Sequence, residues 1–329
     1  MQLTEKIKKR LLARKYKKSK MLFYLKGMLN VLIPDIYYRN RRRSLLDTIS
    51  RYDTNYIQKR VAYYNKKISS FTLGTDALRL NDLSARQQSS YYFDLQEYLR
   101  YFSPNRSFHR EFGDVMQVPS RPTFVKNRPI SGNNENAILL KFNKIRHFNF
   151  INDHLSFTEK SNRLVWRGKA GKPHRIEFIK KHFNNPLFDL GQSNTPEPGG
   201  DPARQKAFMS IAEQLRFKFI LSIEGNDVAT NLKWIMSSNS LCFMRKPRNE
   251  TWYMEGTLQP DIHYVLLKDD YSDIESKMEY YTRNENAALE IIKQANEYTK
   301  QFQDKQRETL IGLLVIQQYF QQSGQDILP

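Results

Sequence analysis

Apolar residues recur at two kinds of spacing along the chain. Residues 44–70 and 84–103 place apolar and aromatic side chains three or four positions apart, which predicts helices, and Pro104 ends the second one. Residues 115–130 hold short apolar runs broken by prolines, as in strands or extended loops. Residues 137–151 return to helical spacing, so the first part of the chain is predicted to be mainly helical.

Beyond residue 155, short apolar runs alternate with amphipathic segments. The predicted strands are 164–166, 187–190, 217–223 and 240–243, and the predicted helices are 175–183, 203–215 and 229–236. This alternation is typical of a parallel, doubly wound sheet. Residues 191–202, rich in Pro and Gly, are expected to form a mobile surface loop, and residues 272–322 are expected to be helical. We place a domain boundary near residue 155, between residues 1–155 and 156–329.

Composition supports this outline. The 329 residues are 40% hydrophobic and 26% charged, which is typical of a globular α/β protein with room for two lobes. The single cysteine, Cys242, excludes an intrachain disulfide and a cysteine-based zinc cluster, and it favours a reducing compartment, the cytoplasm. The apolar stretch 21–38 is interrupted by Lys26, Pro34 and Asp35, so we expect neither a signal peptide nor a transmembrane anchor.

Charge is distributed unevenly. The net charge is +19, and residues 1–60 alone contain 17 Lys and Arg against 4 Asp and Glu. Such a segment attracts nucleic acid, an anionic membrane surface or an acidic glycolipid alike. Apolar residues interleave with its lysines, which favours a helix lying in a membrane interface over a solvated basic face on a core helix. The apolar residues are Leu11, Leu12, Met21, Leu22, Phe23, Leu25, Met28, Leu29, Val31, Leu32 and Ile33, and the lysines are Lys15, Lys17, Lys18, Lys20 and Lys26.

The first candidate for chemistry is the end of the predicted strand at 164–166. The chain continues as Arg167-Gly168-Lys169, followed by Lys172 and Arg175. Ligands of open α/β sheets bind at this edge, a glycine admits close backbone approach, and a guanidinium donates two hydrogen bonds to a phosphate at once. An anion site is one interpretation, and an ordinary exposed basic loop is the other.

A second candidate follows the predicted strand at 217–223. Its turn and the predicted helix start contain Gly225, Asn226, Asp227, Ala229, Thr230, Asn231 and Lys233. Backbone N–H groups at a helix start attract anions, to which Thr230 and Asn231 would add side-chain donors and Lys233 a charge. The alternative is that Asn226 or Asp227 only caps the helix.

Residues 246–256 form a third candidate, ahead of an apolar stretch at 261–265. Glu250 and the aromatic residues beside it could hold a sugar or a ribose by hydrogen bonds and stacking. The alternative places Trp252 and Tyr253 in the core and uses Glu250 as a helix cap.

In their order and spacing, these three segments resemble glycosyltransferase family 90, the lipopolysaccharide-modifying and protein O-glucosyltransferase group. Trp166-Arg167-Gly168 is similar to the family's aromatic-Arg-Gly strand end, Gly225 to Lys233 to its donor loop, and Glu250 to Val265 to its acidic-aromatic segment. The resemblance spans roughly residues 114–302. It implies two Rossmann-like lobes of GT-B type, here with a helical, basic N-terminal segment and a C-terminal helix, and a UDP-sugar donor in the C-terminal lobe.

The resemblance also implies direct inversion at the anomeric carbon without a metal. The sequence holds no Asp-X-Asp, the carboxylate pair that metal-dependent transferases use, so cations and helix-start amides must neutralise the leaving group. No cofactor is expected, because the UDP-sugar is a substrate. The expected donor-binding residues are Arg167, Gly168, Lys169, Arg175, Gly225, Asn226, Asp227, Ala229, Thr230, Asn231, Lys233 and Glu250.

At the catalytic base the chain departs from the family pattern. Eukaryotic members carry an aspartate just before a proline in a segment similar to Lys126-Asn127-Arg128-Pro129, and neither Asn nor Arg can take the proton of an acceptor hydroxyl. Asp114 is the predicted substitute, ahead of Glu111 and Glu135, although it can also merely end a turn after Gly113. Lys126 and Arg128 are predicted to bind phosphates of the acceptor.

We therefore predict a hexosyltransferase that moves glucose or galactose from a UDP-sugar to a lipid-linked acceptor, the lipopolysaccharide core oligosaccharide. The basic N-terminus would place it peripherally on the inner face of the cytoplasmic membrane, and no nucleic-acid partner is expected. Two alternatives stay open: a basic nucleic-acid-binding protein, and a sugar-nucleotide-binding protein that has lost its activity.

Overall fold

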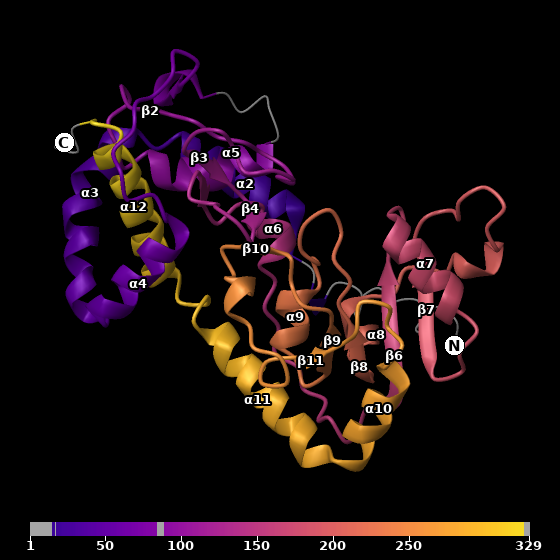
Figure 1. The fold of residues 1–329 in the computed structure, drawn as a ribbon. Coiled ribbons are helices and arrows are strands. Elements are labelled where there is room, and N and C mark those ends of the chain that lie inside the picture. The colour runs from indigo at the N-terminus through magenta and orange to yellow at the C-terminus, as the bar shows by residue number, and fades with distance from the viewer. Residues whose placement is uncertain (1–14, 17, 84–88, 326–329) are drawn as a thin grey trace. The chain divides into compact units, whose positions relative to one another are not determined.

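The computed structural model describes residues 15–16, 18–83 and 89–325 of the chain (Figure 1). The chain folds into two compact units. Unit 1 is built mainly from His147–Pro247 and Thr257–Gln301. Unit 2 is built from Ser19–Arg146, Arg248–Gly256 and the chain that follows Gln301. Each unit therefore combines segments that are far apart in the sequence.

Unit 1 contains the predicted parallel sheet. Its five strands are β6 (Ser161–Gly168), β7 (Phe188–Gln192), β8 (Phe217–Leu221), β9 (Leu241–Met244) and β11 (Val265–Leu266). Every pair is parallel, and the order across the sheet is β7, β6, β8, β9, β11. In chain order this is a 2-1-3-4-5 sheet, one of the doubly wound arrangements. The α/β class is confirmed, as are the four strands predicted between 164 and 243.

Unit 1 also contains the helices α7 (Pro173–His182), α8 (Ile211–Gln214), α9 (Leu232–Met236), α10 (Ile274–Arg283) and α11 (Glu285–Lys300). Of these, α7, α9, α10 and α11 contact strands of the sheet. Apolar side chains of the sheet, α7, α10 and α11 form one buried core. The helix predicted at 203–215 is wrong, because only 202–204 and 211–214 are helical. Ser210 begins α8 with a capping box, in which Ser210 and Glu213 each bond the other's backbone N–H, and the chain before it is not helical.

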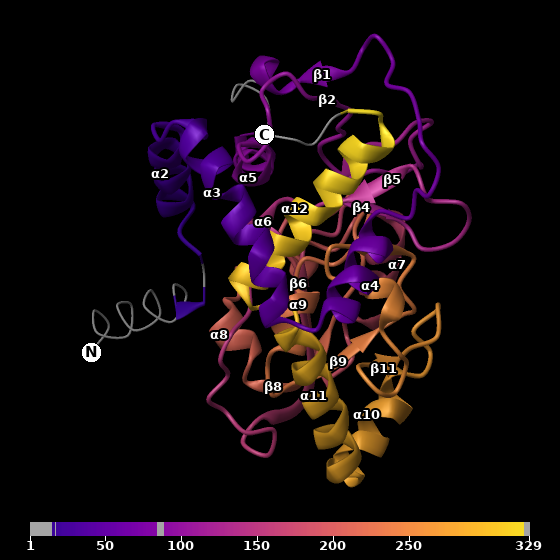
Figure 2. The ribbon, with the colours of Figure 1, turned by 90° about the vertical axis from the view of Figure 1, so that its left-hand side faces the viewer.

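Unit 2 is rich in helices. They include α2 (Lys20–Val31), α3 (Asp35–Asp47), α4 (Thr54–Tyr64), α5 (Ser89–Leu99) and α12 (Lys305–Gln322), and α12 runs between α4 and α5 (Figure 2). The helix predicted at 44–70 is interrupted, since a 3-10 turn covers Thr48–Arg51 and Asp53 caps α4 by accepting a hydrogen bond from the Tyr56 N–H. The helical stretch predicted at 272–322 is confirmed as α10, α11 and α12, with short breaks between them.

The strands of unit 2 pair as three two-stranded sheets within the described residues. β1 (Leu78–Arg79) pairs with β2 (Ser107–Phe108), β3 (Thr123–Val125) with β5 (Ala137–Leu139), and β4 (Asn127–Pro129) with β10 (Asn249–Thr251). The expected second Rossmann-like sheet is not seen in this part of the chain. Prolines near the strands keep them short, because proline donates no hydrogen bond to a ladder. The helix predicted at 137–151 is likewise replaced by β5 and the single turn α6 (Lys144–His147).

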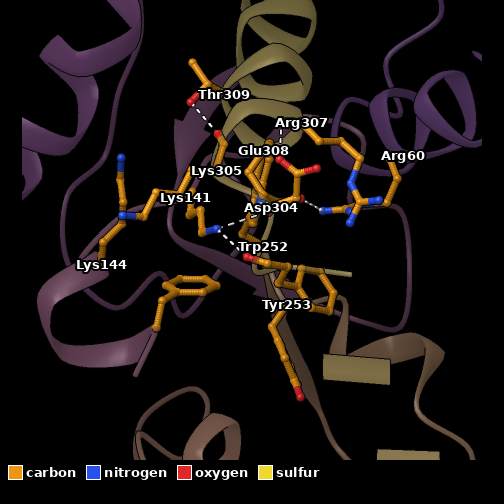
Figure 3. Close-up of polar contacts among 12 residues, drawn as sticks. Arg60, Lys141, Lys144, Trp252, Tyr253, Asp304, Lys305, Arg307, Glu308 and Thr309 are labelled. Atoms are coloured by element: carbon orange, nitrogen blue, oxygen red, sulfur yellow. Dashed lines mark hydrogen bonds and ion pairs between the residues drawn. The ribbon is translucent and has the colours of Figure 1, made fainter. Parts of the chain in front are cut away.

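A buried ionic cluster joins several segments of unit 2 (Figure 3). The carboxylate of Glu308, on α12, accepts hydrogen bonds from Arg60 Nη2 at 3.0 Å, Lys141 Nζ at 3.1 Å and Trp252 Nε1 at 2.6 Å. The Tyr64 ring stacks on Trp252 with 3.8 Å between the ring centroids. Burial opposes the ionisation of Glu308, but the charges of Lys141 and Arg60 lower its pKa below the ordinary value. Trp252 is thus a core residue.

α2 lies at the surface with none of its residues buried. Met21 is 75% exposed and Leu32, which follows the helix, is 77% exposed. Among the described helices, none combines the length and the apolar character that crossing a bilayer requires. Leu11, Leu12 and Lys17 of the predicted membrane segment lie outside the described residues.

Cys242 is buried in β9, and burial raises the pKa of its thiol. Because the thiolate is the reactive form, we expect Cys242 to react with dithiobis(nitrobenzoate) far more slowly in the native protein than in the urea-unfolded chain. Colour development as fast in buffer as in urea would show that β9 is open to solvent.

Candidate functional site

Two of the candidate segments follow the strands at which the order of the unit 1 sheet reverses. β6 lies between β7, the next strand in the chain, and β8, the one after that. β6 ends at Gly168 and β8 ends at Leu221. Doubly wound sheets bind ligands outside the carboxyl ends of the strands at this switch point. The loops after β6 and β8 are therefore the expected binding loops of unit 1.

Arg175, in the first turn of α7, connects these two loops. Its Nε donates to the backbone oxygen of Glu224 at 2.9 Å, its Nη2 to that of Ile223 at 2.6 Å, and its Nη1 to that of Lys169 at 3.0 Å. His174 Nε2 also lies 2.9 Å from the Glu224 oxygen. Hydrogen bonds from a charged donor are stronger than neutral ones, so Arg175 fixes both loops at once.

Further positive charge lies around this connection. The side chains of Lys169 and Lys172 are exposed, and Lys172 is the N-cap residue of α7. This ten-residue helix begins with Pro173 and has no hydrogen bond from a capping side chain. Its dipole adds partial positive charge at the same end. The arrangement can hold a ligand that carries phosphate groups.

Gly168 is required by close packing at the end of β6. A Cβ atom placed on it would lie 2.8 Å from the Trp166 ring, too close for any side chain there without moving the indole. Gly225 is less constrained, because a Cβ there would meet Arg175 Nη2 at 3.5 Å, an ordinary contact. Close packing therefore requires a glycine at position 168 but not at position 225.

Arg167, a predicted donor contact, is paired within unit 1. Its guanidinium donates to Asp189 Oδ1 at 2.8 Å and to the backbone oxygens of Trp166 and Asp189, and only 6% of its side chain is exposed. Burial opposes the ionisation of Asp189, but the hydrogen bond and charge of Arg167, with Lys206 at 3.3 Å, lower its pKa. The pair ties β6 to β7, so we assign Arg167 to positioning the strand end.

The loop after β8 differs from the predicted helix start. α9 has only five residues, and Asn231 precedes it without capping it. Instead, Asn231 Nδ2 donates to the Leu221 oxygen at 3.0 Å and Oδ1 accepts from the Ser222 hydroxyl at 3.2 Å. Lys233 is fully buried, with Nζ 5.8 Å from the centre of the Phe148 ring, so it is no exposed charge. The other predicted members are exposed Asn226, half-buried Gly225 and Thr230, and buried Asp227 and Ala229.

Glu250 and Arg128 form a buried pair in unit 2, where β10 and β4 run antiparallel. Arg128 Nε donates to Glu250 Oε1 at 2.8 Å, and its other nitrogens donate to the backbone oxygens of Ala137, Tyr64 and Tyr63. Glu250 also accepts a hydrogen bond from the Tyr63 hydroxyl. The predicted contacts of Glu250 with a ribose and of Arg128 with an acceptor phosphate would require this pair to break. We therefore assign both residues to the fold of unit 2.

Asp114 and Lys126, the predicted base and acceptor contact, form an ion pair. The segment is held in place because the Val115 N–H donates to Asn127 Oδ1 at 3.0 Å and Asn127 Nδ2 donates to the Val115 oxygen at 2.8 Å. The side chain of Lys126 is 3% exposed and that of Asp114 is 33% exposed. Gly113, with φ of 107°, makes the turn that presents the Asp114 carboxylate to solvent.

Sequence reasoning missed His174, whose ring contacts the Glu224 oxygen in the loop after β8, and Asp189, which holds Arg167. Six scattered histidines show no spacing that marks one of them. Asp189 lies in β7, the strand next to β6. This position in the neighbouring strand was the sequence signal that could have identified it as a partner of Arg167. Within the described residues, no three His, Cys, Asp or Glu side chains gather in a way that could hold a metal ion.

Comparison with known proteins identifies the family. Residues 140–319, just over half of the chain, match Glycosyl transferase family 90. O-glucosyltransferase LpsA of Dichelobacter nodosus is 43% identical over 92% of this chain and 95% of its own length. Protein O-glucosyltransferase 3 of Homo sapiens is 24% identical over 50% of this chain and 33% of its own length. The chain therefore belongs to glycosyl transferase family 90 and is a glycosyltransferase.

Proposed function

We propose that the protein transfers glucose from UDP-glucose to the core oligosaccharide of a lipopolysaccharide acceptor, with inversion and without a metal. The observation that carries this proposal is the cationic end of β6, where Arg175 fixes both loops beside the exposed Lys169 and Lys172. A UDP leaving group carries two phosphates, and cations fixed before the reaction stabilise the charge that develops on it. The Dichelobacter nodosus relative is called an O-glucosyltransferase, which supports glucose over galactose.

In the proposed reaction, the acceptor hydroxyl attacks the anomeric carbon of the donor sugar while the bond from that carbon to UDP breaks. The hydroxyl proton passes to a carboxylate, for which we propose Asp114. The charge released on the diphosphate is neutralised by Arg175, Lys169 and Lys172. Since Lys126 already pairs with Asp114, we propose that it orients this carboxylate and does not contact an acceptor phosphate.

We further propose that unit 1 is the donor-binding half of a GT-B-type fold and that the protein lies peripherally on the inner face of the cytoplasmic membrane. The sheet order of unit 1 supports the first assignment. The exposed apolar residues of α2 and the excess of Lys and Arg in residues 1–60 support the second.

Binding of the donor without a metal tests this function. The purified protein is expected to bind UDP-glucose and to hydrolyse it slowly in EDTA, with no gain on adding Mg²⁺ or Mn²⁺, because its own cations neutralise the diphosphate. Calorimetry with a panel of UDP-sugars and an assay of released UDP measure both steps. Failure to bind any UDP-sugar would disprove the proposal. If the protein instead bound RNA with an affinity that falls with salt, the nucleic-acid alternative would be favoured. Tight donor binding with no turnover would identify an inactive family member.

Replacing Asp114 with asparagine separates donor binding from transfer. The affinity for UDP-glucose is expected to stay within about twofold, while transfer to a lipopolysaccharide core acceptor falls by about 100-fold or more, because an amide cannot accept the proton. Asp76→Asn is the control, since its carboxylate is 67% exposed and pairs with Arg121. Transfer by Asp114→Asn at the wild-type rate would exclude Asp114 as the base.

A further inference from the structure

We propose that a cavity in unit 2 binds the phosphate group of an anionic membrane lipid. The inference deepens the peripheral membrane association proposed above and rests on it. The cavity has a volume of about 630 Å³ and is bounded by α3, the chain after α5, and Gln317 of α12. Its cationic lining residues are Arg39, Arg42, Arg43 and Arg106.

No acidic residue is among the described residues that line this cavity. The two carboxylates of α3 do not compensate for the arginines: Asp35 is bound by Arg100 at 2.9 Å, and Asp47 is not part of the lining. Four guanidinium groups around one space repel each other unless an anion joins them. The charge pattern therefore points to a bound anion.

Contacts with neighbouring side chains hold Arg42 in place at the cavity. Its Nη2 donates to Gln317 Oε1 at 2.9 Å, and its guanidinium carbon lies 4.5 Å from the centre of the Phe102 ring. Burial and the nearby charge of Arg106 both lower the pKa of Arg42. A phosphate between these two side chains would relieve that repulsion, since guanidinium groups bind phosphate oxygens in pairs.

Apolar surface beside the cations indicates that the phosphate belongs to a lipid. Leu46, Tyr101 and Phe102 contribute to the same cavity. Tyr101 also lines a second cavity of about 270 Å³, one wall of which is α2. The arginine cavity is thus linked through one side chain to the helix with the exposed apolar face.

The apolar face of α2 has the spacing of an interfacial helix. Met21, Leu25, Met28 and Leu32 recur at intervals of three or four, and they are 75%, 49%, 57% and 77% exposed. Such a stripe inserts at the boundary between lipid headgroups and acyl chains, where cations next to it meet lipid phosphates. The arginine cavity would take one headgroup while α2 rests in the interface.

Vesicle flotation with the full-length protein tests this inference. Wild-type protein is expected to bind phosphatidylcholine vesicles that contain phosphatidylglycerol better than phosphatidylcholine alone. The variant R39Q/R43Q/R106Q leaves Arg42 in its packing position and removes three charges from the cavity. The control R41Q/R51Q/K59Q removes three charges from exposed positions that do not line it. We expect the cavity variant to bind the anionic vesicles at least about tenfold more weakly than the control.

Equal losses in the two triple variants would overturn the inference, because only overall charge would then matter. Displacement from the vesicles by millimolar inorganic phosphate would overturn it as well, since the site would then hold free phosphate instead of a lipid. If the arginines of the cavity bound RNA in preference to anionic vesicles, the inference would also be overturned. Circular dichroism checks that both variants fold.

Two further measurements keep this inference apart from the proposed function. L25Q/M28Q changes only the apolar face of α2 and is expected to weaken binding to every vesicle. If it binds as wild type does, the membrane association itself is wrong. Hydrolysis of UDP-glucose by R39Q/R43Q/R106Q is expected to equal that of wild type, so a failed lipid assay would leave the transferase assignment standing.

Discussion

Replacing Glu308 with glutamine is expected to lower the free energy of unfolding of unit 2 by about 3–5 kcal/mol. The amide keeps the shape of the side chain but not its charge, so the buried cations of Arg60 and Lys141 lose the anion that they share. Trp252 reports the unfolding of unit 2, because the other tryptophans, Trp166 and Trp234, belong to unit 1. Urea unfolding followed by tryptophan fluorescence in a W166F/W234F background measures the change.

Glu111→Gln is the matched control for this prediction. Glu111 lies in unit 2 and its side chain is exposed, so the loss of its charge is expected to cost less than about 0.5 kcal/mol. If the free energy of unfolding of Glu308→Gln lay within about 1 kcal/mol of the wild-type value, the Glu308 carboxylate could not be a charged group that both cations share.

Replacing Arg175 with alanine is expected to lower kcat/KM for UDP-glucose by about 100-fold, which corresponds to about 2.7 kcal/mol of transition-state stabilisation. The change removes a cation from the proposed diphosphate site and three hydrogen bonds to the backbone of both binding loops. Arg175→Lys is expected to restore little, because one ammonium group cannot reach the three carbonyl oxygens that a guanidinium spans. Steady-state kinetics and calorimetry separate the loss of donor affinity from the loss of turnover.

Lys181→Ala removes the same charge from the same helix and serves as the control. Lys181 is exposed, and its Nζ donates to the Asp270 oxygen at 3.3 Å. The kcat/KM of the Lys181→Ala variant is expected to stay within about twofold of wild type. If both variants lost activity equally, the charge of α7 would matter and the geometry of Arg175 would not.

The sequence predicted the architecture of unit 1 well because the hydrophobic runs that form its strands can be recognised locally in the chain. Most of its strands contain a short run of buried apolar residues, Gly168 ends β6, and Gly225 lies in the loop after β8. Strand ends of a parallel sheet share one edge, so the positions of the two loops could be inferred before their contacts were known. The helix at 203–215 failed because periodicity alone does not show that Ser210 starts a new helix.

The roles of single side chains were harder to predict, because they depend on partners distant in the chain. Arg167 was predicted from the sequence only as a donor contact, and the sequence did not show that Asp189 from the neighbouring strand pairs with it. Arg128 and Glu250 seemed to belong to different sites, yet they bond each other across β4 and β10. No local spacing encodes a salt bridge between residues more than a hundred positions apart.

The pairing of β4 with β10 and the late position of α12 bear on how the chain folds during synthesis. All strands of the unit 1 sheet lie within one stretch, from Ser161 to Leu266, and can pair as soon as that stretch leaves the ribosome. Arg60 and Lys141 are made early, but Glu308 arrives only with α12. Contacts of large sequence separation form slowly. Unit 2 is therefore expected to stay incomplete until α12 has been synthesised, and a chain that stops before Lys305 would leave two buried cations without their counter-ion.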